Sequence, residues 1–344
     1  MAGLLHLGVE IPSPELARLL GEQLGALPEA LDDSGAAYVL LGADRADGAD
    51  GARPSPSPTV VGTLLARRSG RIGIVVAASP QRDHPFNVAR RVASLDHVSD
   101  GRAGLLGLAR DGANGLGVAD GSTWAPGPLG DEELADGLLA VRKLWRTWPV
   151  ETLVEGPAAF ERALRYADHV GVFPTRGPLN SPTTPQGEPV VFWRLRSSQP
   201  AELLPELATA VTVADVVLID ADVLGALDAG PRRAVGESVA AADPTVQLHV
   251  RVEGPARDLP ERIARLSATP GLSGVTVVSS AADLQTFGRN LVPELASAGV
   301  VSPPAEPEPS SLRARLGIPR RAEPDLTGNP PAFPVVPLAS KEPA

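Results

Sequence analysis

The chain has 344 residues, of which 43% are hydrophobic and 21% are charged, so it is long enough for one large core or two modest ones. A net charge of -10 without a basic stripe argues against a protein that binds nucleic-acid phosphates. The absence of cysteine excludes disulfides, thiolate zinc sites, iron–sulfur clusters and a thiol nucleophile.

The distribution of apolar and basic residues bears on localisation. No basic region precedes an apolar one at the N-terminus, and no apolar run approaches the length that spans a membrane. We therefore expect a cytoplasmic protein with neither membrane nor nucleic-acid partners. The five histidines are scattered without the paired spacing of metal ligands, so no metal site is expected.

The segment from Ile72 to Leu108 has the pattern of a strand, a helix and a second strand. Residues 72–78 are apolar throughout and rich in β-branched side chains, as in a strand buried on both faces. Asp83 can cap a helix that Pro85 opens and Gly101 ends. Two parallel strands joined in this way need a right-handed crossover.

The same alternation is expected along the whole chain. Strands are predicted at residues 4–9, 37–41, 72–78, 103–108, 190–194, 216–219, 246–252 and 274–278. Helices are predicted at residues 13–31, 58–67, 85–101, 131–148, 201–211, 231–242, 259–266 and 281–298. Eight such repeats predict a closed (β/α)₈ TIM barrel, and an open doubly wound sheet is the alternative.

Two stretches depart from the alternation. Residues 149–188 contain a proline-rich loop and are interpreted as an insertion after strand four. Residues 302–344 are proline-rich and charged, which predicts a C-terminal arm or disordered tail, with one or two helical turns at 311–317. The barrel itself is expected to occupy residues 1–301.

Residues 84–104, which read HPFNVARRVASLDHVSDGRAG, resemble a signature of the bacterial luciferase-like flavin-dependent monooxygenases. The branch that they resemble includes the nitrilotriacetate and dibenzothiophene-sulfone monooxygenases. Further landmarks of that family follow in the same order, at residues 144–148, 176–180, 185–190, 214–217, 292–295 and the turn ending at Gly317. The resemblance implies the barrel that the repeats also predict.

The resemblance implies an oxidoreductase that uses reduced FMN and O₂ to oxygenate a small organic substrate. Such enzymes receive reduced FMN from a separate NAD(P)H:flavin reductase, so a reductase is an expected partner. FMN is favoured over the deazaflavin F420 because the matching signature belongs to the FMN branch. Barrels of this family commonly dimerise, which makes a homodimer compatible with the resemblance. The protein would hold the flavin at the strand ends and exclude water.

The resemblance places five residues at the cofactor. Asp44 follows the second strand and corresponds to an acidic residue near the flavin ring, and Ser79 follows the third strand. Arg196, Ser197 and Ser198 stand where the family has a Gly-Ser-Ser turn that binds the phosphate. A solvated loop carboxylate for Asp44, and helix caps for the serines, are the alternative interpretations.

The remaining motif residues leave the catalytic groups unknown. His84, at the start of the signature helix, is a weak substrate-binding candidate, and a capping or packing role is the commoner one for such a histidine. The resemblance implies hydroxyl and amide side chains where this chain has Ala77, Leu106 and Ala109, and it implies glycine where this chain has Arg196 in the phosphate turn. Each lost polar partner costs about 1 kcal/mol of binding free energy. A catalytically degenerate barrel, acting as a non-catalytic partner or small-molecule binder, is therefore the second hypothesis.

Overall fold

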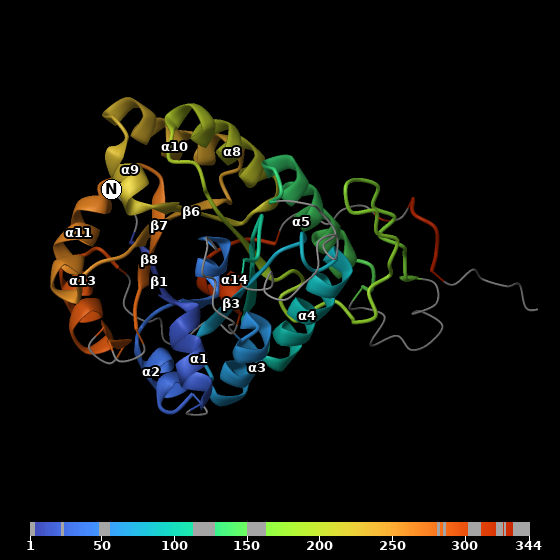
Figure 1. Cartoon of the computed structure of the whole chain (residues 1–344), viewed down its shortest axis with the longest axis horizontal. Helices are drawn as coiled ribbons and strands as arrows, with labels where there is room; N and C mark the ends of the chain where they lie inside the picture. Colours follow the sequence, from blue (N-terminus) through green and yellow to red (C-terminus); the bar gives the residue numbers. More distant parts are fainter. Residues whose placement is uncertain are drawn as a thin grey trace, which may run out of the picture.

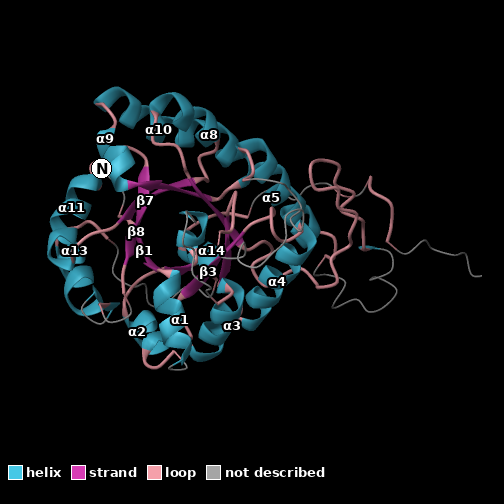
Figure 2. Ribbon diagram, viewed as in Figure 1, coloured by secondary structure: helices cyan, strands magenta, loops and turns pink. Residues whose placement is uncertain are grey.

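The computed structural model describes residues 4–21, 24–47, 56–112, 128–149, 163–280, 283–284, 287–301, 311–320, 326 and 328–332. Its centre is a ring of strands, and the main helices lie around the outside of that ring (Figures 1 and 2). Among the helices in these ranges, none is long and apolar enough to cross a bilayer.

Eight parallel strands close into one barrel in chain order. They are β1 (His6–Ile11), β2 (Tyr38–Leu41), β3 (Gly73–Ala78), β4 (Ala103–Gly107), β5 (Val190–Arg194), β6 (Val216–Asp220), β7 (Gln247–Val252) and β8 (Leu272–Val278). The first and last strands pair in parallel, from His6 opposite Gly274 to Glu10 opposite Val278. The predicted (β/α)₈ barrel is confirmed, and this pairing excludes the open sheet.

The helices lie around the outside of the barrel, except the last one, which lies at its amino-terminal end. They are α1 (Ser13–Gly21), α2 (Leu27–Asp33), α3 (Pro58–Arg68), α4 (Pro85–Val98), α5 (Asp131–Trp145), α8 (Pro200–Val213), α9 (Ala221–Ala226), α10 (Ala229–Ala242), α11 (Leu259–Leu266), α13 (Val292–Ser297) and α14 (Leu312–Arg315). Three tighter or wider turns complete the set: η1 (Ala43–Asp47), η3 (Ala256–Asp258) and the π-helical turn η4 (Phe287–Leu291).

The observed helices differ from the predicted ones in three places. The helix expected at residues 13–31 is two helices, because Leu24 and Gly25 take φ angles of 64° and 47°, in the left-handed region. The short helix α9, directly after β6, was not predicted. In the described part of residues 281–298, a π-helical turn precedes α13, so that stretch is not one regular helix.

The amino-terminal end of the barrel is closed by the C-terminal segment. Leu312, Leu316 and Ile318 are buried in the same apolar cluster as Val75 and Phe192, whose side chains fill the barrel. Gly73 leaves the space for Leu312, since a Cβ there would lie 2.6 Å from the leucine Cδ1. The helical turn predicted within residues 311–317 is observed as α14, and residues 311–320 pack against the barrel. The other residues of the predicted arm or tail lie mostly outside the described ranges.

Buried charges fasten this segment to the barrel wall. The Arg313 guanidinium donates to Asp215 at 3.0 Å and to the Glu188 carbonyl at 3.2 Å. Arg142 on α5 contacts both Asp215, at 3.3 Å, and the Glu188 carboxylate. Arg146 donates to Glu188 at 2.6 Å. Each buried charge in this group has an opposite partner, which is the condition for holding charges inside a protein.

A second buried polar group lies inside the barrel. The Tyr38 hydroxyl lies 2.9 Å from His249 Nδ1 and 2.7 Å from Thr276 Oγ1. His249 Nε2 lies 3.0 Å from the Gln247 side-chain oxygen. The rings fit because two strand positions are glycine: a Cβ on Gly8 would meet the Tyr38 ring at 2.3 Å, and one on Gly274 would meet His249 at 2.5 Å.

Burial, together with the smaller effect of the neighbouring His6, lowers the pKa of His249 to about 3. The ring is therefore neutral in the folded chain. In the unfolded chain an ordinary histidine takes up a proton below about pH 6.5, so protons favour unfolding between the two pKa values. Burial acts in the opposite direction on Asp96, where it raises the carboxyl pKa to about 6.

We expect His249 to make the protein less stable as the pH falls from about 6.5 to about 4. This contribution to the free energy of unfolding should change by about 1.4 kcal/mol per pH unit. Urea unfolding of wild type and His249→Asn across this range measures it, and the variant should lose that slope. Asp96→Asn is the control of opposite sign and should steepen the slope. Parallel wild-type and His249→Asn curves would contradict the assignment.

We expect Leu312→Ala to lower the free energy of unfolding by about 2–5 kcal/mol, because it empties a fully buried position at the base of the barrel. Ala314→Ser, at an exposed position of the same helix, is the control and should change stability by less than about 0.5 kcal/mol. Chemical unfolding measures both. Equal stability of the two variants would mean that α14 does not hold the barrel together.

Candidate functional site at the carboxyl ends of the strands

The carboxyl ends of the eight strands surround one mouth of the barrel, and the turn η1 lies across it. Figure 1 shows this turn as the short blue coil at the centre of the ring. Ala43 of η1 is fully buried in one apolar cluster with Leu40, Ala77, Leu106 and Leu108. The positions where the family carries hydroxyl and amide groups are therefore packed against protein here.

A buried ion pair holds η1 in this place. Arg45 Nε and Nη2 donate to the two oxygens of Asp111 at 3.1 and 2.9 Å. The side chains of Arg45 and Asp111 are only 2% and 5% exposed. The Gly112 amide also donates to the Arg45 carbonyl at 3.0 Å. A two-pronged arginine–carboxylate pair is among the stronger polar contacts, so the loops after β2 and β4 are joined across the mouth.

Four further charged side chains line the carboxyl end of the barrel. Arg251 on β7 donates to the Glu10 carboxylate at 2.7 and 2.8 Å, and lies 3.6 Å from Asp220. Arg194 on β5 donates to Asp220 at 2.8 Å. Burial would lower the pKa of Arg251, but the hydrogen bond and charge of Glu10 outweigh it and raise that pKa.

Sequence reasoning missed this group of four. Glu10 and Arg251 lie within β1 and β7, Arg194 and Asp220 end the apolar strands β5 and β6, and charges in such strands are rarely buried without a partner. That was the available signal, but it does not reveal which residues pair.

Asp44 lies where the resemblance placed it, directly after β2 in η1. Its carboxylate accepts from the Ser13 amide at 3.1 and 3.0 Å and from the Ser13 hydroxyl at 2.8 Å. Ser13 is the first residue of α1, so Asp44 serves as a remote acceptor for the start of that helix. A flavin contact for Asp44 stays a prediction.

Ser79 and His84 stand at the two ends of the loop that joins β3 to α4. Ser79 is buried, and its hydroxyl accepts from the Gln81 amide at 3.3 Å. His84 precedes α4, and its Nδ1 accepts from the Phe86 amide at 3.2 Å, which makes it the N-cap. Burial lowers the pKa of His84. His84 therefore has the capping role that was its alternative, whereas Ser79 stabilises the turn before it; the ligand roles of both stay predictions.

The predicted phosphate turn holds an internal carboxylate. Glu206 on α8 is buried and accepts from the backbone amides of Arg196 and Ser197, each at 3.0 Å, and from the Trp193 indole at 3.1 Å. The Arg196 guanidinium contacts the same carboxylate at 3.4 Å and also pairs with Asp131. Ser198 is exposed beside this cluster. The turn therefore does bind an anion, and that anion belongs to the chain.

The fold and these polar groups define a (β/α)₈ barrel whose candidate site lies at the carboxyl ends of its strands, as in enzymes of this fold. The Luciferase-like monooxygenase family matches residues 20–219. A subunit of the pristinamycin IIA synthase of Streptomyces pristinaespiralis is 30% identical over 270 residues, which cover 76% of this chain and 77% of that protein. The chain belongs to the luciferase-like monooxygenase family.

The other relatives match over shorter stretches. Nitrilotriacetate monooxygenase component A of Aminobacter aminovorans is 30% identical over 179 residues, or 47% of this chain. Dibenzothiophene-sulfone monooxygenase of Rhodococcus erythropolis is 32% identical over 153 residues, or 42% of this chain. The chain spans only 37% and 33% of the length of these two relatives. The predicted family and branch are confirmed.

Solved structures support the fold. A long-chain alkane monooxygenase superposes with a TM-score of 0.68 at 14% identity, covering 92% of this chain and 96% of that protein. A sequence identity of 14% supports a shared fold and does not indicate a shared ligand.

The residues expected to bind FMN already contact other parts of the chain. Ala77 and Leu106 lie beneath η1, the Asp44 carboxylate accepts from Ser13, and Glu206 fills the anion-binding turn. A phosphate bound at that turn would lie close to the Glu206 carboxylate, and the two negative charges would repel each other. FMN binding at these described positions would therefore require the contacts that they now make within the chain to rearrange.

We expect Glu206→Ala to open the anion-binding turn. The variant should be less stable than wild type, because three backbone and indole donors lose a charged acceptor worth about 1.5–3 kcal/mol. Inorganic phosphate should then raise the melting temperature of Glu206→Ala more than that of wild type, since a ligand stabilises the state that binds it. Glu237→Ala, which removes an exposed carboxylate of α10 that pairs with Arg233, is the matched control. An identical phosphate response in all three proteins would remove the anion-binding role of this turn.

Proposed function

We propose that this chain is a flavin-dependent monooxygenase that takes reduced FMN from a separate flavin reductase and uses O₂ to oxygenate a small organic substrate. The observation that carries the proposal is the family match over residues 20–219, which includes the carboxyl ends of β2 to β5. The relatives support it by name, since two are called monooxygenases and a third is called a component of one.

FMN is the proposed flavin rather than F420. Among the solved structures of the same fold, a riboflavin lyase is described with modified FMN, and a tetrahydromethanopterin reductase is described as dependent on F420. The riboflavin lyase superposes with a TM-score of 0.68 at 19% identity, and the reductase with a TM-score of 0.54 at 14% identity. The fold of this chain is therefore more similar to that of the riboflavin lyase, but identities this low do not identify the ligand. The sequence relatives named for oxygenation favour FMN, because oxygen insertion is flavin chemistry.

A second candidate function is favoured by the closed mouth. Arg45 and Asp111 hold η1 over the strand ends, and Glu206 occupies the anion-binding turn. The pristinamycin relative, matched over 77% of its length, is named as one subunit of a synthase, which implies an enzyme of more than one chain. A barrel that supports a catalytic partner without binding flavin itself would account for both observations.

Anaerobic titration with reduced FMN, oxidised FMN and F420, followed by flavin fluorescence, separates the two candidates. A monooxygenase should bind reduced FMN with a dissociation constant in the micromolar range, on the order of -8 kcal/mol of binding free energy. Binding of F420 in place of FMN would contradict the choice of cofactor. No flavin binding up to about 1 mM, which is weaker than about -4 kcal/mol, would leave only the non-catalytic role.

If FMN binds, Arg196→Ala should weaken FMN about tenfold and riboflavin much less, because the guanidinium would contact only the phosphate. Arg67→Ala, on the exposed end of α3 away from the strand ends, is the matched control for loss of a positive charge. Fluorescence titration of both variants with both flavins measures the effect. Equal weakening of FMN and riboflavin would remove the phosphate role of Arg196.

A further inference from the structure

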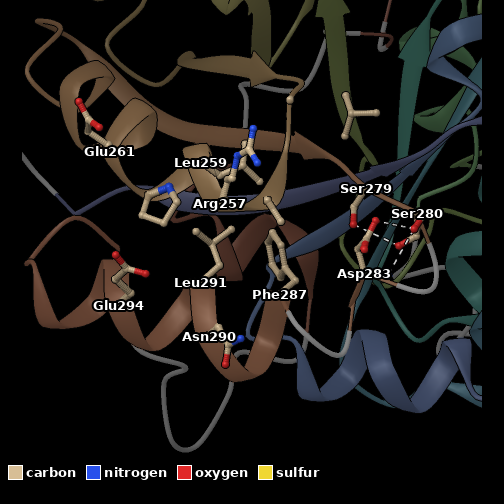
Figure 3. A pocket seen from close by; sticks show the side chains of 14 residues that line it. Arg257, Leu259, Glu261, Ser279, Ser280, Asp283, Phe287, Asn290, Leu291 and Glu294 are labelled. Carbon is tan, nitrogen blue, oxygen red and sulfur yellow. Dashed lines mark hydrogen bonds between the residues drawn. The ribbon is translucent and has the colours of Figure 1, made fainter.

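A cavity of about 430 Å³ lies beyond the carboxyl ends of β7 and β8, between α11 and the segment formed by η4 and α13 (Figure 3). Its volume is within the range of small-molecule sites, which occupy about 300–1,000 Å³. None of the residues predicted to bind flavin lines it. The cavity is therefore a separate candidate site on the functional face of the barrel.

The floor of this cavity is apolar. Leu259 at the start of α11 and Phe287 and Leu291 of η4 are buried and face the space between the two helical segments. Two of these three side chains come from a π-helical turn, and such turns occur frequently at functional sites. An apolar body of about the size of an aromatic ring would gain free energy here by displacing water from these side chains.

The rim of the cavity is acidic. Figure 3 shows Glu261 and Glu294 at one end, from facing helices, and Asp283 with Ser279 and Ser280 at the other. Ser280 donates to the Asp283 carboxylate at 2.6 Å, which orients that end. The rim glutamates are exposed, so their charges act through solvent and are screened by salt.

One cation opposes these three carboxylates among the described lining residues. The Arg257 side chain is 84% exposed and contacts Asp258 at 3.5 Å, outside the cavity lining. An ion pair this exposed contributes about 0–1 kcal/mol and leaves the net charge of the cavity negative. An anionic ligand would be repelled by this rim, and a cation would be attracted.

We propose that this cavity binds a small organic cation: an amine whose apolar body rests on Leu259, Phe287 and Leu291 while its ammonium group faces Glu261 and Glu294. The apolar floor provides affinity, and the rim charge selects the sign of the ligand. The site does not depend on flavin binding, so it stands or falls separately from the proposed function.

Ligand-observed NMR titration of the full chain tests the charge preference with three probes of one shape: 2-phenylethylammonium, 3-phenylpropionate and 2-phenylethanol. We expect the amine to bind about tenfold more tightly than the carboxylate, with the alcohol between them. Added salt should reduce the preference for the amine. Equal affinity for amine and carboxylate would overturn the assigned charge, and no amine binding up to about 10 mM would overturn the site.

Substitutions at exposed positions locate the binding. The double change Glu261→Gln and Glu294→Gln should weaken the amine about five- to tenfold and leave the alcohol unchanged. Glu237→Gln, an exposed carboxylate on α10 outside the cavity lining, is its control.

Asn290→Trp should fill the cavity and abolish binding of all three probes, and Arg289→Trp, its exposed neighbour outside the lining, should not. Circular dichroism checks that each variant is folded. Unchanged amine affinity in folded Asn290→Trp would place the binding elsewhere and overturn the proposal.

Discussion

The parallel pairing of β1 with β8 joins the two ends of the sheet from His6 opposite Gly274 to Glu10 opposite Val278. Closing the sheet forces alternate residues of every strand into a narrow interior, where their volumes have to match. Glycine at positions 8 and 274 makes the room that the Tyr38 and His249 rings fill. The same closure brings all eight strand ends to one mouth, which is why the candidate site depends on it.

Both ends of the barrel are then closed by segments of the chain, each fastened by buried charge pairs. At the amino-terminal end, Arg313 holds α14 to Asp215, and at the mouth Arg45 holds η1 to Asp111. Breaking one partner of such a pair leaves a buried charge uncompensated and costs about 3–5 kcal/mol. A ligand that displaces η1 has to compensate for the packing and the charge pairing that are lost there.

The anion-binding turn after β5 shows how a ligand site and a structural contact use the same physics. Backbone amides at 196 and 197 point toward one acceptor, and the indole of Trp193 adds a third donor. Such a group binds any well-placed anion, whether a phosphate or the carboxylate of Glu206. The buried glutamate satisfies the amides of a turn that has arginine at position 196, where the resemblance implies glycine.

The sequence alone determined the repeating pattern, and with it the barrel. The spacing of apolar residues shows which face of a strand or helix is buried, and this spacing can be read from the sequence without the structure. The length of the signature at residues 84–104 likewise placed the chain in its family. The order of motifs along the chain also placed Asp44, Ser79 and the turn at 196–198 at the ends of their strands.

Only the tertiary structure decided what those residues contact. Asp44 and Ser13 are separated by 31 positions, and Arg45 and Asp111 by 66, so neither pairing leaves a periodic trace. The burial of α14 could not be predicted either, because a helix of four residues has too few apolar positions to show which surface it packs against. Pairing of charges depends on which loops meet in space, and only chain closure brings those loops together.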